Sequence, residues 1–165
     1  FEVLTAHIDP ASTECLNTAS GGTGADLVNG KGVKSAVDEQ LLFFVPFTSS
    51  VKVNAIRIYA DPDDDSAPRG IKVFSNKTGI SFSEAEGSAG VQQLTINPSQ
   101  FSSEEKAVDI KLRFARFQDV QSMTLFVHSN QGDEAATRVQ KVEFVGKANA
   151  TPNMADLKAV EEHAH

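Results

Sequence analysis

The length, composition and charge of this chain exclude several classes of protein. Its 165 residues suit a single domain with a sizeable core, and 40% of them are hydrophobic. The net charge of −7 argues against nucleic acid, whose phosphates require a basic face, and disfavours an anionic membrane surface. The single cysteine, Cys15, excludes an intramolecular disulfide and a cysteine-based zinc site, which fits a reducing compartment. No apolar run approaches the roughly 20 residues of a transmembrane helix, and the start, FEVLTAHIDP, lacks the pattern of a signal peptide.

Strand patterns dominate from residue 41 onward. The segment LLFFVPF is apolar on both faces, as in a central buried strand. In VKVNAIRIYA the apolar positions change phase, which predicts a β-bulge near Asn54–Ala55. In AVDIKLRF apolar and charged residues alternate, so we expect the apolar positions to face inward as far as Phe114. The predicted strands are 41–47, 51–60, 70–76, 91–96, 107–114, 121–129 and 137–146. Short strands with polar turns are typical of an all-β sandwich or jelly roll.

Helix signals are few. The Gly-rich segment 18–34 predicts a long, mobile loop. SFSEAEG (81–87) predicts one helical turn, with Ser81 or Ser83 as its cap. NMADLKAVEE (153–162) predicts a short C-terminal helix with an apolar stripe, followed by a polar tail. The 11 phenylalanines are expected to fill the core, because Phe has no polar group to satisfy.

One acidic run suggests calcium at first sight. In DPDDDSAP, the residues Asp61, Asp63 and Asp65 have the first spacings of an EF-hand loop. The sixth position is Ser66 instead of Gly, and the twelfth is Lys72 instead of Glu. We therefore expect a solvated acidic turn between two strands.

No catalytic constellation is visible. No carboxylate pair and no Ser/His/Asp set is placed by a recognisable motif, so we expect no enzymatic activity and no cofactor. Cys15 is expected to be a small buried hydrophobe, since Glu14 beside it would oppose a thiolate. His128 ends a predicted strand and is expected to be structural or to face solvent.

Seven segments in a fixed order take the interpretation further. They are ECLN (14–17), DEQLLFFVPF (38–47), IKVFSN (71–76), FSEAE (82–86), RFQDVQSMTLFVHSNQG (116–132), TRVQKVEFVG (137–146) and NMADLKAV (153–160). Together they closely resemble the PITH domain, the C-terminal module of proteasome-interacting thioredoxin-like proteins. The resemblance implies a jelly-roll β-sandwich of the galactose-binding-like type that binds the 19S regulatory particle of the 26S proteasome, in the cytoplasm and nucleus. We accordingly expect residues 1–13 to be an N-terminal leader, 14–150 the PITH β-sandwich domain, and 151–165 a helix and flexible tail.

The chain departs from a thioredoxin-linked member in one respect, because it has no CxxC motif. Dithiol exchange needs a second sulfur, so this chain cannot be an oxidoreductase, and a thioredoxin domain would belong to the parent protein. The start at Phe1 instead of Met fits a piece of a longer protein. The expected function is non-catalytic docking of a thioredoxin-like protein onto the 19S particle. The alternative is a small-ligand or carbohydrate-binding module, by analogy of fold, although the chain has no Trp and only Tyr59 as a tyrosine.

The loop SNQGDEAATR is the first candidate for partner contact. Its residues Asn130, Gln131, Thr137 and Arg138 offer hydrogen bonds to a partner, since rigid β scaffolds often display recognition residues on loops. The alternative is a plain strand connection in which Gly132 permits the turn.

The C-terminal tail is the second candidate. Glu161, Glu162, His163 and His165 are too polar to pack on the sandwich, so any role should lie in contacting a partner. No intrinsic metal site is expected, but His165 and its carboxylate could reach a basic or metal-containing pocket of that partner. The alternative is a disordered tail without a function.

Overall fold

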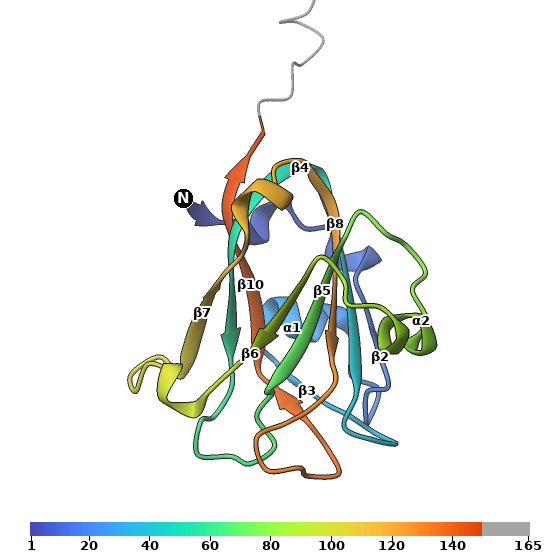
Figure 1. Ribbon diagram of the computed structural model, residues 1–165, viewed down its shortest axis with the longest axis vertical. Helices are drawn as coiled ribbons and strands as arrows, with labels where there is room; N and C mark the ends of the chain where they lie inside the picture. Colours follow the sequence, from blue (N-terminus) through green and yellow to red (C-terminus); the bar gives the residue numbers. More distant parts are fainter. Residues whose placement is uncertain (150–165) are drawn as a thin grey trace, which may run out of the picture.

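The computed structural model describes residues 1–149, which form a curled antiparallel β-sheet around a core (Figure 1). The strands are β1 (Glu2–Val3), β2 (Glu14–Leu16), β3 (Val33–Lys34), β4 (Leu41–Tyr59), β5 (Gly70–Ser75), β6 (Gln92–Thr95), β7 (Ala107–Lys111), β8 (Val120–Val127), β9 (Arg138–Val139) and β10 (Lys141–Ala148). The fold is the predicted jelly-roll sandwich. No helix in the described part of the chain is long and apolar enough to cross a membrane.

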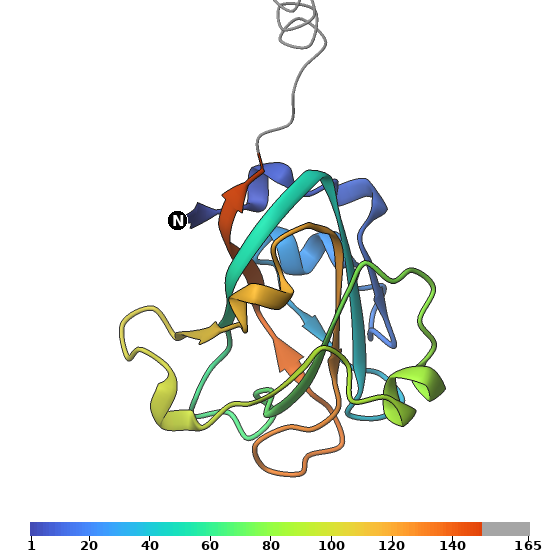
Figure 2. The ribbon, with the colours of Figure 1, turned by 45° about the horizontal axis from the view of Figure 1, so that its top comes forward.

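Strand β4 joins the two layers of the sandwich. Its first half pairs with β2 and β8, and its second half pairs with β10 and β7. The register with β8 shifts between Pro46 and Val51, and Figure 2 shows β4 passing over the top of the molecule. The predicted strands 41–47 and 51–60 are therefore two halves of one strand of 19 residues. One layer has the order β2-β4-β8-β5-β6 and the other the order β1-β10-β4-β7.

The bulge predicted from the phase change lies in the second half of β4. Val145 pairs with Ala55 and Gly146 pairs with Val53, which leaves Asn54 as the extra residue. A Cβ on Gly146 would collide with the carbonyl oxygen of Lys52, so glycine is required opposite the bulge. Val53 and Ile56 both face the core on either side of the bulge.

Phenylalanine fills the core, as expected. Phe43, Phe117 and Phe144 are fully buried between the layers, and Phe126 lies in a smaller cluster on the outer side of β4 and β8. The prediction that Phe114 faces inward was wrong, because β7 ends at Lys111 and the chain turns away. Where the layers open between β6 and β7, the side chain of Gln92 bridges them. Its amide nitrogen donates to the Lys111 carbonyl at 3.2 Å, and its amide oxygen accepts from the Arg113 N–H at 2.7 Å.

Two short α-helices lie beside the sheet, and one of them was unexpected. Helix α2 (Phe82–Gly87) is capped by Ser81, which confirms the predicted turn. Helix α1 (Gly24–Asn29) forms inside the segment predicted to be a mobile loop. Thr23 and Asp26 make a reciprocal capping box at its start. The 3-10 turns are η1 (Thr5–His7), η2 (Pro10–Ser12), η3 (Pro98–Gln100) and η4 (Phe114–Arg116).

The first 13 residues pack onto the sandwich, although the sequence set them apart as a leader. Strand β1 extends the second layer by pairing with β10, and Leu4 and Ile8 are buried in the core. The predicted helix 153–162 and the tail lie outside the described residues.

Candidate functional site

Asn130 and Thr137, two of the predicted contact residues, are buried. The Asn130 amide nitrogen donates to the carbonyl oxygens of Glu134 and Ala136, and its oxygen accepts from the Glu134 N–H at 2.7 Å. The Thr137 hydroxyl donates to the Glu39 carbonyl at 2.6 Å. Asn130 is 1% exposed and Thr137 0%. Both side chains are therefore committed to holding the loop and do not face a partner.

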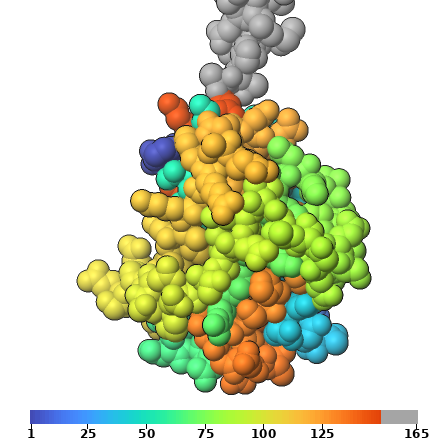
Figure 3. Space-filling view, viewed as in Figure 1, coloured from blue at the N-terminus to red at the C-terminus, as the bar shows by residue number. Residues whose placement is uncertain are grey.

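The Gln131 side chain also makes hydrogen bonds within the domain. Its amide nitrogen donates to the carbonyl oxygens of Pro68 at 2.9 Å and Ile96 at 2.7 Å, which ties the loop to two neighbouring segments. In Figure 3 the loop (orange) packs against the acidic turn (green) at the lower end of the molecule. Arg138 is exposed at this end. Of the four loop residues, Arg138 therefore presents its side chain to solvent, and the predicted tail residues lie outside the described part of the chain.

The role of Gly132 differs from the predicted one. The left-handed residue of the turn is Asp133, with φ of 52°, and not Gly132. A Cβ on Gly132 would lie 2.5 Å from the Cβ of Asp65, and its N–H donates to the Asp65 carbonyl at 2.8 Å. Glycine is needed here for the close approach of the acidic turn.

The acidic turn itself is held by local hydrogen bonds. A carboxylate oxygen of Asp61 accepts from the Asp63 N–H at 3.0 Å, and one of Asp64 accepts from the Ser66 N–H at 2.8 Å. Among residues 1–149 no group of three His, Cys, Asp or Glu side chains is arranged to hold a metal ion. Asp61, Asp63 and Asp65 are exposed, so most of the turn faces solvent, as predicted.

A polar basin of about 740 Å³ opens beside Arg138. Its charged lining residues are Asp26, Lys31, Lys34, Asp61, Asp64 and Arg138. No aromatic side chain lines it. The basin offers mixed charges but no flat apolar platform on which a sugar ring would stack.

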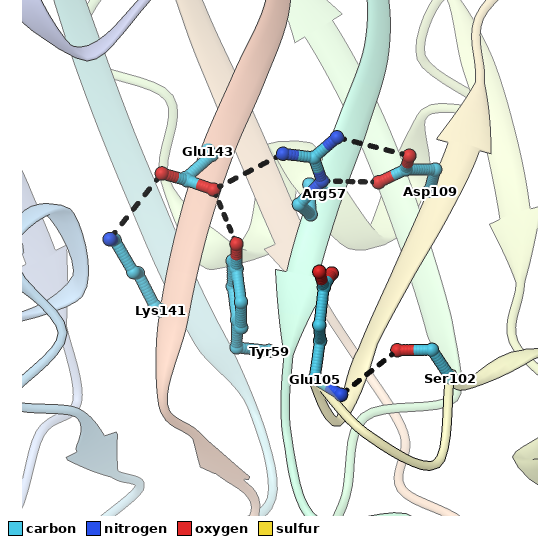
Figure 4. Close-up of polar contacts among 7 residues, drawn as sticks. All are labelled: Arg57, Tyr59, Ser102, Glu105, Asp109, Lys141 and Glu143. Carbon is cyan, nitrogen blue, oxygen red and sulfur yellow. Dashed lines mark hydrogen bonds and ion pairs between the residues drawn. The ribbon is translucent and has the colours of Figure 1, made fainter. Parts of the chain in front are cut away.

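A network of charged side chains covers the outer face of the second layer (Figure 4). Arg57 on β4 donates from Nε to Asp109 on β7 at 2.6 Å, and from a terminal nitrogen to the second oxygen at 3.2 Å. On β10, Glu143 accepts from the Tyr59 hydroxyl at 2.6 Å and lies 3.6 Å from Arg57 and 3.4 Å from Lys141. The strand register explains the network, because Arg57 is paired with both Asp109 and Glu143.

Two members of the network have shifted pKa values. The hydrogen bond to Asp109 raises the pKa of Arg57, which keeps the guanidinium charged. Burial, and then the hydrogen bond to Glu143, raises the pKa of Tyr59. The Lys141 ammonium also lies over the Tyr59 ring, 5.6 Å from its centre. Both the ring face and the hydroxyl of the single tyrosine are thus occupied.

Cys15 and His128 are the two remaining side chains of a potentially reactive type, and neither is activated by its surroundings. Cys15 is partly buried against the core, less than was expected, but burial still raises the pKa of its thiol to about 12, so the thiolate is scarce at neutral pH. Burial, followed by the nearby Lys72 charge, lowers the pKa of His128, which packs beside Phe126 with ring centres 5.8 Å apart. Neither residue has the surroundings of a catalytic nucleophile or base.

Comparison with known proteins shows the family. The PITH domain model matches residues 1–164, and the chain belongs to the PITH domain family. It is 31% identical to "Thioredoxin-like protein 1" of Schizosaccharomyces pombe over 166 residues, covering 98% of this chain and 57% of that protein. It is 30% identical to "PITH domain-containing protein 1" of Homo sapiens over 151 residues, covering 87% of this chain and 67% of that protein. The chain thus spans little more than half of the S. pombe relative. The name of the human relative states a domain and indicates no catalytic activity.

Solved structures show the same fold at low sequence identity. The C-terminal domain of a chitobiase from Bacteroides fragilis has a TM-score of 0.64 and 10% identity, covering 91% of this chain and all of that chain. The CBM32-1 and CBM32-2 domains from Clostridium perfringens ZmpB, in complex with GalNAc, have a TM-score of 0.65 and 11% identity, covering 99% of this chain and 45% of that chain. These likenesses establish the galactose-binding-like jelly roll and nothing about ligands.

Proposed function

We propose that this chain is a non-catalytic protein-interaction module that docks a thioredoxin-like protein onto the 19S regulatory particle of the 26S proteasome. The observation that carries the proposal is the PITH family match over residues 1–164, together with the identity to a thioredoxin-like protein along 98% of the chain. The proposed setting is the cytoplasm and nucleus. A thioredoxin domain of the parent protein would supply any redox chemistry.

The chemistry of this chain supports a binding role. Dithiol exchange needs two sulfurs, and the chain has only Cys15, whose thiol pKa is about 12. Its charged network on β4, β7 and β10 is internally paired and lies on an open sheet face. Small-molecule and catalytic sites are usually concave pockets, and this network is not arranged as one.

The alternative of a carbohydrate-binding module is less well supported. The basin beside Arg138 has no aromatic lining. The ring face and hydroxyl of Tyr59 are engaged by Lys141 and Glu143. With no tryptophan in the chain, a stacking platform would have to come from phenylalanine.

The tail remains part of the proposal. Glu161, Glu162, His163 and His165 would contact the partner, with His165 and its carboxylate reaching a basic or metal-containing pocket. Deleting residues 161–165 should then weaken binding without lowering the melting temperature.

Co-migration on a native gel tests the proposal. The 165-residue chain is mixed with 26S proteasomes and, separately, with bare 20S core particles. Migration with the 19S-capped species alone supports docking, and its loss on deleting residues 161–165 would assign the contact to the tail. Absence of co-migration at high chain concentration would overturn the docking function, and a sugar-array screen of the same protein would then test the alternative.

A further inference from the structure

The strand register arranges the outer face of the second layer in rows. One row holds Glu143, Arg57 and Asp109, which form the network described above. The next row towards the top of the sandwich contains apolar positions on three adjacent strands and ends in a lysine. It consists of Val3, Val145, Ala55 and Lys111. The row beyond the bulge pairs Lys147 with Lys52. We call the last two rows together with η4 the upper face.

The upper face carries more lysine and arginine side chains than acidic side chains that could pair with them. The acids of the neighbouring row, Glu143 and Asp109, are already engaged by Arg57, Lys141 and Tyr59. Within residues 1–149, no ion pair involves the face's three lysines or the two arginines of the segment that follows β7. These residues are Lys52, Lys111, Lys147, Arg113 and Arg116. A protein with a net charge of −7 therefore carries a local group of uncompensated positive charges.

Apolar side chains are exposed on the same face. Phe114 is 36% exposed and Val3 38%. The Phe1 and Phe114 rings meet edge to face with centres 6.0 Å apart, although they belong to segments at opposite edges of the layer. Exposed aromatic and aliphatic groups that adjoin unpaired cations are unusual on a monomer's surface and typical of protein interfaces.

Most acidic groups lie elsewhere, although the exposed Asp119 carboxylate accepts from the Ser50 hydroxyl, two residues from Lys52. Glu104, Glu105 and Asp61 are at the opposite end of β7, in or beside the turn that precedes it, and Asp61 pairs with Lys106. Glu2, on β1 at the edge of the face, lies 3.7 Å from the His7 ring, which is a cation only when it is protonated. The end of the second layer that carries the apolar residues thus holds five cations without an ion pair among the described residues, Lys52, Lys111, Lys147, Arg113 and Arg116, against the two acids Glu2 and Asp119.

We propose that the upper face is a docking surface for an acidic protein segment that carries apolar side chains. Charge complementarity selects the acidic partner, and Phe114 with Val3 supplies the apolar contact that a polyanion such as nucleic acid does not require. The inference rests on the proposed function for the partner's identity, since the face would then be the one turned to the 19S particle. It places part of the contact on the folded domain, apart from the tail.

Charge reversal with a matched control tests the surface. The variant Lys52→Glu/Lys111→Glu/Lys147→Glu should bind 26S proteasomes about tenfold more weakly than the unchanged chain, because the attractions of two exposed lysines and the partly exposed Lys52 become repulsions. The control Lys31→Glu/Lys34→Glu/Lys77→Glu changes the net charge equally, on exposed lysines that have no ion pair among the described residues. Equal weakening by both variants would overturn the surface in favour of a net-charge effect. Unchanged binding by the first variant would overturn the surface and leave the docking function intact.

A variant that leaves the net charge unchanged tests the apolar contribution of the upper face to binding. Phe114→Ser should weaken binding roughly fivefold, whereas Leu16→Ser, at an exposed apolar position of the other layer, should not. Melting curves confirm that each variant is folded.

Peptide binding tests the upper face without the proteasome, so the inference can still be decided if the chain does not bind the 19S particle. NMR chemical shifts are recorded with a 15-residue peptide of alternating Glu and Leu, with its Lys/Leu counterpart, and with an oligothymidine of equal length. Shifts at Ala55, Lys111 and Val145 caused by the acidic peptide alone support the inference. Tighter binding of the oligonucleotide, or shifts confined to other parts of the domain, would overturn it.

Discussion

The side chains of Asn130 and Thr137 hydrogen-bond to each other at 3.1 Å, across the loop that they delimit. The same Asn130 amide serves two backbone carbonyls and one backbone N–H. These backbone groups are partly buried, and each would lose this partner without the amide. The pair therefore fixes the loop between β8 and β9 as part of the rigid structure.

Replacing Asn130 should accordingly cost stability. Asn130→Ala is expected to lower the free energy of unfolding by about 2 to 3 kcal/mol, since the buried Thr137 hydroxyl and three partly buried backbone groups lose a partner. Urea denaturation followed by circular dichroism measures the change. Glu134→Ala in the same loop keeps its backbone bonds and should stay within about 0.5 kcal/mol of the unchanged protein. Equal stability of the two variants would show that the Asn130 bonds are not structural.

Tyr59 should titrate above its ordinary range. Burial and the Glu143 hydrogen bond raise its pKa, and it is the one tyrosine in a chain without tryptophan. Ultraviolet absorbance at alkaline pH therefore reports this residue alone. In the unfolded chain the phenol loses its proton near pH 10, so the stability linked to Tyr59 is present below that pH and is lost as pH rises through the higher folded value. Glu143→Gln should move the titration back towards the ordinary value, and an unmoved curve would rule out coupling to Glu143.

His128 should make stability depend on pH in the opposite direction. Its pKa is lowered in the folded state from an ordinary 6.5. The unfolded chain then binds a proton first as pH falls, so the free energy of unfolding declines from about pH 6.5 down through the lower folded pKa. His128→Gln should flatten this part of the stability profile. His7→Gln serves as the control, and a profile that flattens only in the control would contradict the assignment.

Cys15 should be slow to react in the folded protein. With a thiol pKa of about 12, its reaction with an aromatic disulfide reagent at pH 8 is expected to be on the order of a hundredfold slower than in the urea-unfolded chain. The rate is followed by the absorbance of the released thiolate. Equal rates in the two states would show that the thiol is accessible and ionised, which would reopen a redox role for it.

The sequence predicted those parts of the fold that depend on local pattern. Alternation located β7, a change of phase located the bulge at Asn54, and Ser81 located the start of α2. Helix α1 was missed because its glycines suggested a loop, although the Thr23–Asp26 spacing is a capping signal that could have revealed it.

The candidate site was harder to predict because it depends on the pairing of distant segments. Arg57, Asp109 and Glu143 become neighbours only once β4 lies between β7 and β10. Asn130 and Thr137 looked available for a partner because nothing in the sequence shows how many backbone groups their loop must satisfy. The outward alternation of charged residues on each strand was visible, but the register that assembles them was not.

Because β4 is an interior strand of both layers, displacing it breaks strand pairs in both of them at once. The two halves of the sandwich are thereby tied into one unfolding unit. The amide protons of β4 should exchange with solvent only when the whole domain opens, and partially folded forms with one intact layer should be rare. The upper face is therefore complete whenever the domain is folded, and a partner cannot bind to a partly assembled version of it.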